Sequence, residues 1–212
     1  MSLQIYDFHR EEDIRNILVT PQIRSRFARM EPGEVASYHS HDLGHEIFLI
    51  LQGRAIFEID GEEAELEPGQ MCLALTDQVH QVRAVGDEPM IMYLSVTPHI
   101  QPTHTGRTPE GERMPTHFSP NSSYGVGLDT EAPVEELIER YSGMARNAAE
   151  TIRESADRVE GLKEALAAGD EEAASEVRDA VWKELYQSFK QIYELGDVWN
   201  ELAPRATETK GS

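Results

Sequence analysis

Three side chains of the kinds that bind metal ions, His39, His41 and Glu46, lie within eight residues of one another. Side chains two positions apart on a strand point to the same face, so both imidazoles are expected to project into one interior. Glu46 follows a short turn at residues 42–44, and a chain reversal there would bring its carboxylate to the same interior. Imidazole and carboxylate are ligands for transition metals. The sequence therefore predicts three metal ligands on one hairpin.

A fourth ligand has to come from elsewhere in the chain. Of the five histidines outside residues 39–45, His80 is the best candidate because it lies on a predicted strand of the same region. His45, the neighbour of Glu46, is expected to point to the opposite face of its strand.

The resulting ligand set restricts which ions fit. Three neutral imidazoles and one carboxylate suit one divalent transition metal ion, with Fe or Mn favoured and Ni, Co, Cu or Zn as alternatives, and they do not suit Ca. An octahedral ion with four protein ligands keeps two positions open for water, substrate or O₂. The competing interpretation is an ion that only braces the fold, or histidines that are merely packed. Structural zinc sites are normally closed and rich in sulfur, so the open set favours a catalytic site.

Short strands separated by turns are expected over residues 1–100. Asp60-Gly61 is the strongest hairpin signal, since a type I′ turn needs positive φ at both central positions. Pro68-Gly69 indicates another turn, and residues 90–96 form a nearly continuous apolar strand. Many short strands at spacings of about 8 to 12 residues predict an antiparallel sandwich or barrel.

The periodic pattern is lost over residues 101–129, which are rich in Pro, Thr, Gly and His. A connecting loop of this length in a compact protein is usually functional or a linker. Its histidines and the one just before it, His99, His104 and His117, are expected to be solvated loop residues and not ligands.

Apolar residues recur at steps of three and four over residues 130–203, as in amphipathic helices. Gly169 is a stop signal and Asp170 an N-cap, so two long helices are expected to form an antiparallel hairpin. Trp182 and Trp199 are interpreted as packing residues. Residues 204–212 are polar and expected to be a disordered tail. The apolar faces of the hairpin predict packing on the barrel or on a second copy, which makes a homodimer the expected state.

Composition limits the partners and the chemistry. The chain has 19 Lys and Arg against 39 Asp and Glu, a net charge of −20, so nucleic acid and anionic membranes are poor partners. The first residues lack the pattern of a signal peptide, which predicts a cytoplasmic protein. Cys72 is the single cysteine and is interpreted as a small buried hydrophobe. No lysine precedes Lys163, which excludes Schiff-base chemistry in the N-terminal part.

The order Gly33, five residues, His39-x-His41, four residues, Glu46, six residues, Gly53 resembles the first motif of the cupin family with no departure from its spacing. The resemblance spans residues 20–98. It implies a double-stranded β-helix, or jelly roll, whose metal ion is held by three histidines and one glutamate. The fold class is therefore mainly β, a cupin barrel over residues 1–100 followed by a helical hairpin that is not part of the family core.

A looser resemblance to the second cupin motif begins at Pro68-Gly69, which ten residues separate from His80. Gln70 stands where Asp is common, and residues 74–77 replace an Ile-Pro-Pro-Gly type of turn. Ala84 stands where an Asn often follows. The resemblance implies that His80 is the fourth ligand and leaves the neighbouring loop unassigned.

Two open coordination positions favour an enzyme that acts on a small oxygen-bearing substrate. The leading hypothesis is dioxygenation of a diketone, enediol, catechol-like or flavonol-like molecule, with Glu46 as ligand and proton acceptor. A redox-neutral isomerase or lyase acting on a sugar or uronate-like substrate needs the same Lewis acid without O₂. A thiol dioxygenase is disfavoured, because that cupin branch generally lacks the motif glutamate. A non-catalytic binding or sensing module is the hypothesis from another class.

Several further residues are candidates to face the substrate, although alternation alone does not say which of them point inward. They are Tyr38, Phe48, Arg54, Met71, Gln78, Met92 and Tyr93.

Overall fold

The computed structural model describes residues 3–127 and 132–206. They belong to two compact units, residues 1–128 and residues 129–212, each with its own architecture. The polar tail expected at the C-terminus lies outside the described residues from residue 207 onward, and residues 204 and 205 are still helical.

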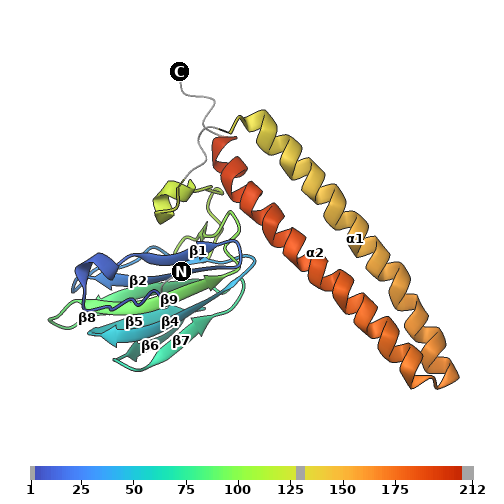
Figure 1. Ribbon diagram of the computed structural model, residues 1–212. Coiled ribbons are helices and arrows are strands. Elements are labelled where there is room, and N and C mark those ends of the chain that lie inside the picture. The colour runs from blue at the N-terminus through green and yellow to red at the C-terminus, as the bar shows by residue number, and fades with distance from the viewer. Residues whose placement is uncertain (1–2, 128–131, 207–212) are drawn as a thin grey trace. The chain divides into compact units, whose positions relative to one another are not determined.

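The described part of the first unit forms two five-stranded antiparallel sheets (Figure 1). The β4 sheet has the order β1 (Asn16–Thr20), β2 (Ile23–Met30), β9 (Met90–Thr97), β4 (His45–Gln52) and β7 (Met71–Ala74). The β8 sheet has the order β10 (Thr105–Gly106), β3 (His39–Ser40), β8 (His80–Val85), β5 (Arg54–Ile59) and β6 (Glu62–Leu66). Two 3₁₀ turns, Glu11–Asp13 and Asn121–Tyr124, complete the elements. The predicted jelly roll is confirmed.

The core lies between the inner faces of the two sheets, as period-two alternation requires. On β4, Glu46, Phe48 and Ile50 are buried and alternate with more exposed side chains. The apolar cluster comprises Ala28, Phe48, Ile50, Ala55, Phe57, Leu66, Ala74, Val82, Ala84, Met90, Met92 and Leu94. Glu46 therefore belongs to the same inward-facing row as two core residues.

The turn signal at Asp60-Gly61 is confirmed. It joins β5 to β6, and both residues have positive φ, 49° and 80°. The residues after β9, in contrast, are not a loose connection. Arg107 donates its backbone N–H to the Tyr38 carbonyl at 2.9 Å, and β10 pairs with β3.

The expectation that the histidines after β9 are solvated is wrong for His99, which is 1% exposed. It is also wrong for His104, which is partly buried, whereas His117 is exposed. The physical reason is that this segment is held by strand pairing and side chain to backbone bonds, neither of which produces a hydrophobic period. The amide of Gln101, for example, donates to the Ser119 carbonyl at 2.9 Å and accepts from the Ser119 N–H at 3.2 Å.

The second unit is an antiparallel pair of helices, α1 (Val134–Ala168) and α2 (Glu171–Arg205), shown side by side in Figure 1. Gly169 ends α1 in the left-handed region with φ 66°, and the Asp170 carboxylate caps α2 by accepting from the Ala173 N–H at 3.0 Å. Both boundary signals are confirmed. The first helix begins at Val134, directly after Pro133, and so later than the expected residue 130.

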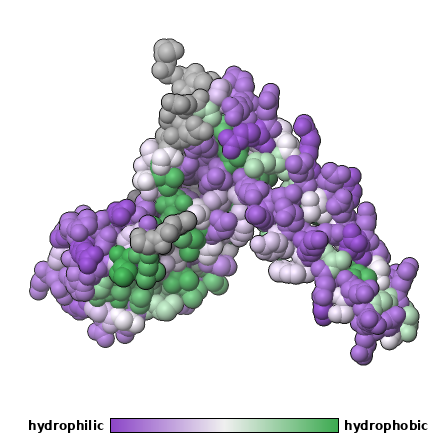
Figure 2. Space-filling model, in the orientation of Figure 1, coloured by the Kyte–Doolittle hydropathy of each residue, from purple (hydrophilic) through white to green (hydrophobic). Residues whose placement is uncertain are grey.

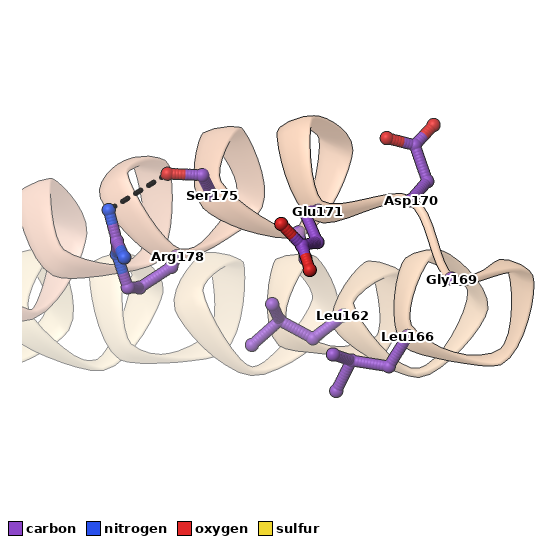
Figure 3. Close-up of a pocket in the computed structure, with 8 residues that line it drawn as sticks. Leu162, Leu166, Gly169, Asp170, Glu171, Ser175 and Arg178 are labelled. Atoms are coloured by element: carbon purple, nitrogen blue, oxygen red, sulfur yellow. Dashed lines mark hydrogen bonds between the residues drawn. The ribbon is translucent and has the colours of Figure 1, made fainter.

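Packing inside the hairpin is concentrated near its open end, where Leu137 and Val198 are buried and the rings of Tyr141 and Trp199 lie 5.8 Å apart. Trp182 is instead 60% exposed, so its packing role inside one chain is not observed. At the other end, a hollow of about 560 Å³ lies beside the turn, lined by Leu162 and Leu166 of α1 and by Glu171 at the start of α2 (Figure 3).

Hydrophobic residues also reach the surface of the first unit. Figure 2 shows them gathered on the face turned to the viewer. Met71 and Leu73 of β7, together with Leu75, are exposed on this unit. Among the described helices, none combines the length and apolar character needed to cross a membrane.

Candidate metal centre

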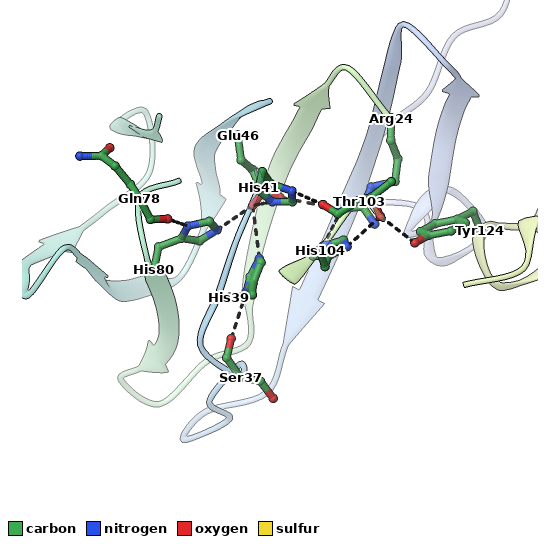
Figure 4. A network of polar contacts seen from close by, with 10 residues as sticks. All are labelled: Arg24, Ser37, His39, His41, Glu46, Gln78, His80, Thr103, His104 and Tyr124. Carbon is green, nitrogen blue, oxygen red and sulfur yellow. Dashed lines mark hydrogen bonds and ion pairs between the residues drawn. The ribbon is translucent and has the colours of Figure 1, made fainter. Parts of the chain in front are cut away.

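Four side chains from separate parts of the first sequence motif and from β8 converge between the sheets (Figure 4). His39 begins β3 and His41 follows it, Glu46 lies on β4, and His80 begins β8 directly opposite His39. One ligand atom from each of the four lies within 4.8 Å of the others. The structure thus brings together the four residues predicted as metal ligands.

The carboxylate of Glu46 is at the centre of this group. Its Oε2 atom is 2.8 Å from Nε2 of His41, 3.0 Å from Nε2 of His80 and 3.6 Å from Nε2 of His39. Glu46, His41 and His80 are each 2% exposed, whereas the His39 side chain is 20% exposed. Solvent therefore reaches the cluster on the His39 side.

The other ring nitrogen of each histidine contacts a backbone carbonyl. Nδ1 of His39 lies 3.0 Å from the Ser37 oxygen, Nδ1 of His80 lies 2.9 Å from the Gln78 oxygen, and Nδ1 of His41 contacts the Thr103 oxygen. A carbonyl can only accept, so each Nδ1 carries a proton and a neutral ring presents a lone pair at Nε2.

This arrangement tests whether the site fits a metal. Three Nε2 lone pairs and a carboxylate oxygen face one another, and four acceptors in contact repel unless protons or a cation lie among them. One divalent cation satisfies all four at once, and imidazole with carboxylate is a donor set for transition metals. The residues present fit such an ion, and the identity of the metal is left open by this donor set.

The charge state of Glu46 agrees with a ligand role. Burial raises its pKa, but in the metal-free site hydrogen bonds from His39, His41 and His80, which require rings protonated at Nε2, outweigh burial and hold the pKa well below the ordinary value. These protons are the alternative to a cation among the four groups. The side chain is therefore an ionised carboxylate, ready to bind a cation.

Sequence reasoning missed a buried polar group next to the cluster. Arg24 of β2 places Nη2 3.9 Å from Oε1 of Glu46 and 3.3 Å from Nε2 of His104. The His104 ring lies 4.9 Å from the ring of His39 and 4.8 Å from that of His41, measured between centroids. The segment after β9 thus forms one wall of the site.

The tautomer of His104 follows from its partners. A guanidinium only donates, so Nε2 of His104 accepts from Arg24 and Nδ1 carries the proton toward Oγ1 of Thr103, 3.0 Å away. Oγ1 of Thr103 in turn lies 3.0 Å from the Tyr124 hydroxyl. Burial, with the Arg24 charge, holds the pKa of His104 well below its usual range, so the ring is neutral.

A sequence signal for Arg24 does exist. Residues 23–30 alternate, with Ile23 and Phe27 on one face and Arg24, Arg26 and Ala28 on the other. The more apolar set would normally be assigned to the interior, but the structure places the arginine face inward, because Ala28 of that face belongs to the core.

Two of the candidate substrate-facing residues, Phe48 and Gln78, contact His80, and a third, Met92, is buried in the core. The Phe48 ring is 5.8 Å from the His80 ring. Gln78 contributes its backbone carbonyl to His80, while its side-chain oxygen accepts from the Leu75 N–H at 2.8 Å. Phe48 and Met92 thus face the interior, and Gln78 acts through its backbone.

The remaining candidates lie on the outer faces of the sheets. The Tyr38 hydroxyl donates to Glu58 at 2.7 Å, and Arg54 forms an exposed ion pair with Glu65. The ring of Tyr93 packs edge-on against Phe27 at 6.2 Å. Met71 is exposed at the start of β7. His45 is exposed as expected, and its Nδ1 accepts from the Thr76 N–H at 3.0 Å. The structure does not bring these residues to the cluster.

A pocket of about 510 Å³ opens along β5, β6 and β7. Phe57, Ile59 and Cys72 line its apolar part. Ile59 is the β5 partner of His80, and the Phe57 ring lies 5.0 Å from that of Phe48. The ring of Phe48 therefore lies between the pocket wall and His80, and none of the four ligand candidates lines the pocket.

Cys72 lines this pocket, but its thiol is expected to be unreactive. Burial raises its pKa to about 12, so almost no thiolate forms near neutral pH. We expect iodoacetamide to alkylate Cys72 in the native protein at pH 8 at least about 100-fold more slowly than in the unfolded chain. Mass spectrometry of timed samples measures both rates, and native and unfolded rates within tenfold of each other would contradict the expectation.

An antiparallel jelly roll with three histidines and one glutamate directed into its interior is the metal-site architecture of a cupin. A family model for the cupin domain matches residues 26–97. The chain also aligns with most of the length of one relative, which is described below. The chain belongs to the cupin superfamily.

Two curated proteins resemble the chain. "Polyketide synthase CurC" from Streptomyces cyaneus is 35% identical over 138 residues, which are 62% of this chain and 77% of the relative. "Oxalate-binding protein" from Thermotoga maritima is 30% identical over 63 residues, and the chain spans about half of its length, 52%, with 29% of this chain aligned. A solved structure from Klebsiella pneumoniae, an uncharacterized protein with a double-stranded β-helix domain, is 23% identical, with a TM-score of 0.42, over 46% of this chain and 91% of its own.

Proposed function

We propose that the protein is a metal-dependent enzyme of the dioxygenase type that acts on a small oxygen-bearing organic substrate. The observation that carries this proposal is the convergence of three Nε2 lone pairs on the Glu46 carboxylate, with the His39 side open to solvent. A divalent Fe or Mn ion held by His39, His41, Glu46 and His80 would supply Lewis acidity and one-electron chemistry toward O₂.

The side chains around this ligand set have definable tasks. The carbonyls of Ser37, Thr103 and Gln78 fix the histidine tautomers. Phe48 and Phe57 pack between this ligand set and the pocket and exclude water on that side, so the substrate is proposed to enter from the His39 side. Glu46 serves as a ligand, because its Oε2 atom lies among the Nε2 atoms of the three histidines.

The name of one relative supports the substrate class. The Streptomyces cyaneus protein is named a polyketide synthase. Polyketides carry β-dicarbonyl and phenol groups, and these are the bidentate oxygen donors that the leading hypothesis requires. We therefore place diketones and phenols first among the substrates to be tried.

Oxygen consumption tests the reaction type. Protein loaded with Fe(II) or Mn(II) is expected to consume O₂ with at least one diketone, catechol or enediol of a panel, at a rate at least about tenfold above the metal-free protein. An oxygen electrode and product mass spectrometry provide the measurement. Substrate turnover that proceeds equally under nitrogen would contradict a dioxygenase and support the isomerase or lyase alternative.

We further propose that the protein forms a homodimer through the hairpin. Apolar residues recur on α1 at every seventh position, the repeat of a helix packed against another helix. These residues are Ile138, Ala145, Ile152, Val159 and Leu166. All but Ala145 are exposed, and Trp182 and Phe189 of α2 are exposed at the same interval.

A double substitution tests this interface. Ile152→Glu with Val159→Glu is expected to convert the dimer to a monomer, because it places charges on the seam, and light scattering reports the mass. Leu73→Glu, on the exposed face of β7, is the matched control and is expected to leave the dimer intact. A monomeric wild type, or a dimer lost only in the Leu73 variant, would make the hairpin assignment wrong.

A further inference from the structure

We propose that Arg24 and Arg26 form an anion-binding subsite beside the metal centre, so that the substrate of the proposed enzyme carries a carboxylate group. This inference rests on the proposed function for the presence of the metal, but it concerns a separate set of residues. No part of the sequence motif contains either arginine, since both lie on β2.

The strand register places both arginines on the inner face of the β4 sheet. Arg24 pairs with Val96 of β9, and Val96 pairs with Glu46. Arg26 pairs with Leu94, which pairs with Phe48. Directly opposed residues of antiparallel strands share a face, so the two guanidinium groups belong to the same interior as the ligands. The 3.9 Å between Nη2 of Arg24 and Oε1 of Glu46 agrees with this placement.

Arg24 is deeply buried, at 5% exposure, yet it is poorly satisfied. The ring of Tyr124 lies under its guanidinium, 5.4 Å from centroid to Cζ, and His104 accepts one hydrogen bond. Its Nε has no hydrogen-bond partner among the described residues, and neither has the buried Nε of Arg26. A buried guanidinium with unmet donors is costly unless an anion binds it.

The charges nearby do not supply that anion. Within the described chain, the carboxylate that acts on both Arg24 and Arg26 is that of Glu46. The Glu46 oxygen Oε2 already faces three histidines. With a divalent ion bound, the positive charges of the ion and of two guanidinium groups would be opposed by the single negative charge of Glu46. This interior is therefore electropositive inside a chain whose net charge is −20.

The geometry favours an oxyanion over a spherical anion, and the proposed occupant is a carboxylate, which is smaller than a phosphate and suits a guanidinium as buried as that of Arg24. A guanidinium presents a planar fork of donors that matches a carboxylate in bidentate fashion. The contacts to His104 and to the Tyr124 ring restrain the plane of Arg24, so less entropy is lost when the anion binds. A carboxylate-bearing diketone or phenol could therefore be oriented by Arg24 while its other oxygens face the ligand cluster.

The test uses Zn²⁺-loaded protein and two planar probes of equal size, benzoate and benzamide, with binding measured by calorimetry. Wild type is expected to bind benzoate and to prefer it to benzamide. Arg24→Gln is expected to weaken benzoate binding about 10- to 100-fold, the loss of charge-assisted hydrogen bonds, with benzamide binding unchanged. Arg26→Gln is expected to weaken benzoate binding by a smaller factor.

Arg29→Gln is the matched control, because Arg29 lies on the same strand but on its outer face, paired with Glu11 and Glu31. It is expected to bind benzoate as wild type does. Arg24→Lys keeps the charge and loses the fork, so an intermediate affinity is expected. Arg24→Lys and Arg26→Gln also carry the test if Arg24→Gln does not fold, as judged by its thermal unfolding.

Three results would overturn the subsite. They are a wild type that does not bind benzoate at millimolar concentration, a wild type that binds both probes equally, and substituted proteins that bind benzoate as tightly as wild type. Zinc content, measured on every sample, separates these outcomes from a failure of the metal site. Oxygen uptake separately tests the reaction, so the subsite and the proposed function can fail independently.

Discussion

Replacing His39 and His80 with alanine in one chain is expected to abolish metal binding. The two imidazoles oppose each other across β3 and β8, and their loss leaves His41 and Glu46 as the remaining ligands. Wild type purified without added metal is expected to hold about one transition metal ion per chain, and the double variant less than about a tenth of that. Each ligand lost costs orders of magnitude in affinity, since even partners outside the ligand shell contribute about 10- to 100-fold. Elemental analysis provides the measurement.

His45→Ala is the matched control, because this exposed histidine adjoins Glu46 but points away from the cluster and contacts Thr76. It is expected to retain the full metal content. Circular dichroism establishes that each variant is folded. Equal metal content in the wild type and a folded double variant would show that the ion, if present, is bound elsewhere.

Gly53→Ala is expected to destabilise the fold by about 3 kcal/mol, the second large effect. Gly53 joins β4 to β5 with φ +67°, a conformation that disfavours any side chain. A Cβ at this position would also lie 2.7 Å from the Pro89 carbonyl oxygen and 2.8 Å from Cα of Met90, both backbone atoms. Urea unfolding followed by circular dichroism measures the loss.

Gly61→Ala separates the two causes. Gly61 also has positive φ, +80°, but a Cβ there would meet nothing within 4 Å. The substitution is therefore expected to cost only about 1 kcal/mol, the strain of the left-handed conformation alone. Equal losses at Gly53 and Gly61 would mean that the close approach of the Pro89 backbone contributes nothing. The need for glycine at position 53, the last glycine of the motif, would then come from its positive φ alone.

The convergence of His39, His41 and Glu46 was predictable because local rules determine their placement. His39 and His41 share a face through the two-residue period of an extended chain, and a short turn returns Glu46 to that face. The helix ends were predictable for a similar reason, since Gly169 and Asp170 act through their own backbone and side-chain chemistry. Signals of this kind are readable over a few residues.

Other features depend on contacts between distant segments. Arg24 reaches Glu46 across β9, and His104 reaches Arg24 from a segment without hydrophobic periodicity. Alternation also leaves the choice of face open, which is why Arg54 and Tyr93 were candidates together with Phe48 and Met92. In the structure, Arg54 and Tyr93 face outward, whereas Phe48 and Met92 face inward. The register of the assembled sheets determines this difference, and no single strand does.

The bond between Nδ1 of His41 and the Thr103 carbonyl makes the candidate metal centre depend on residues outside the span that the family model matches. Affinity for the ion and order in the chain around Thr103 are then two sides of one thermodynamic linkage. Binding of an ion at this site would stabilise the folded state of that segment. Loss of order in the segment would weaken ion binding by the same free energy. Grafting only the motif-bearing strands onto another scaffold would transfer the ligands without the carbonyl that orients His41.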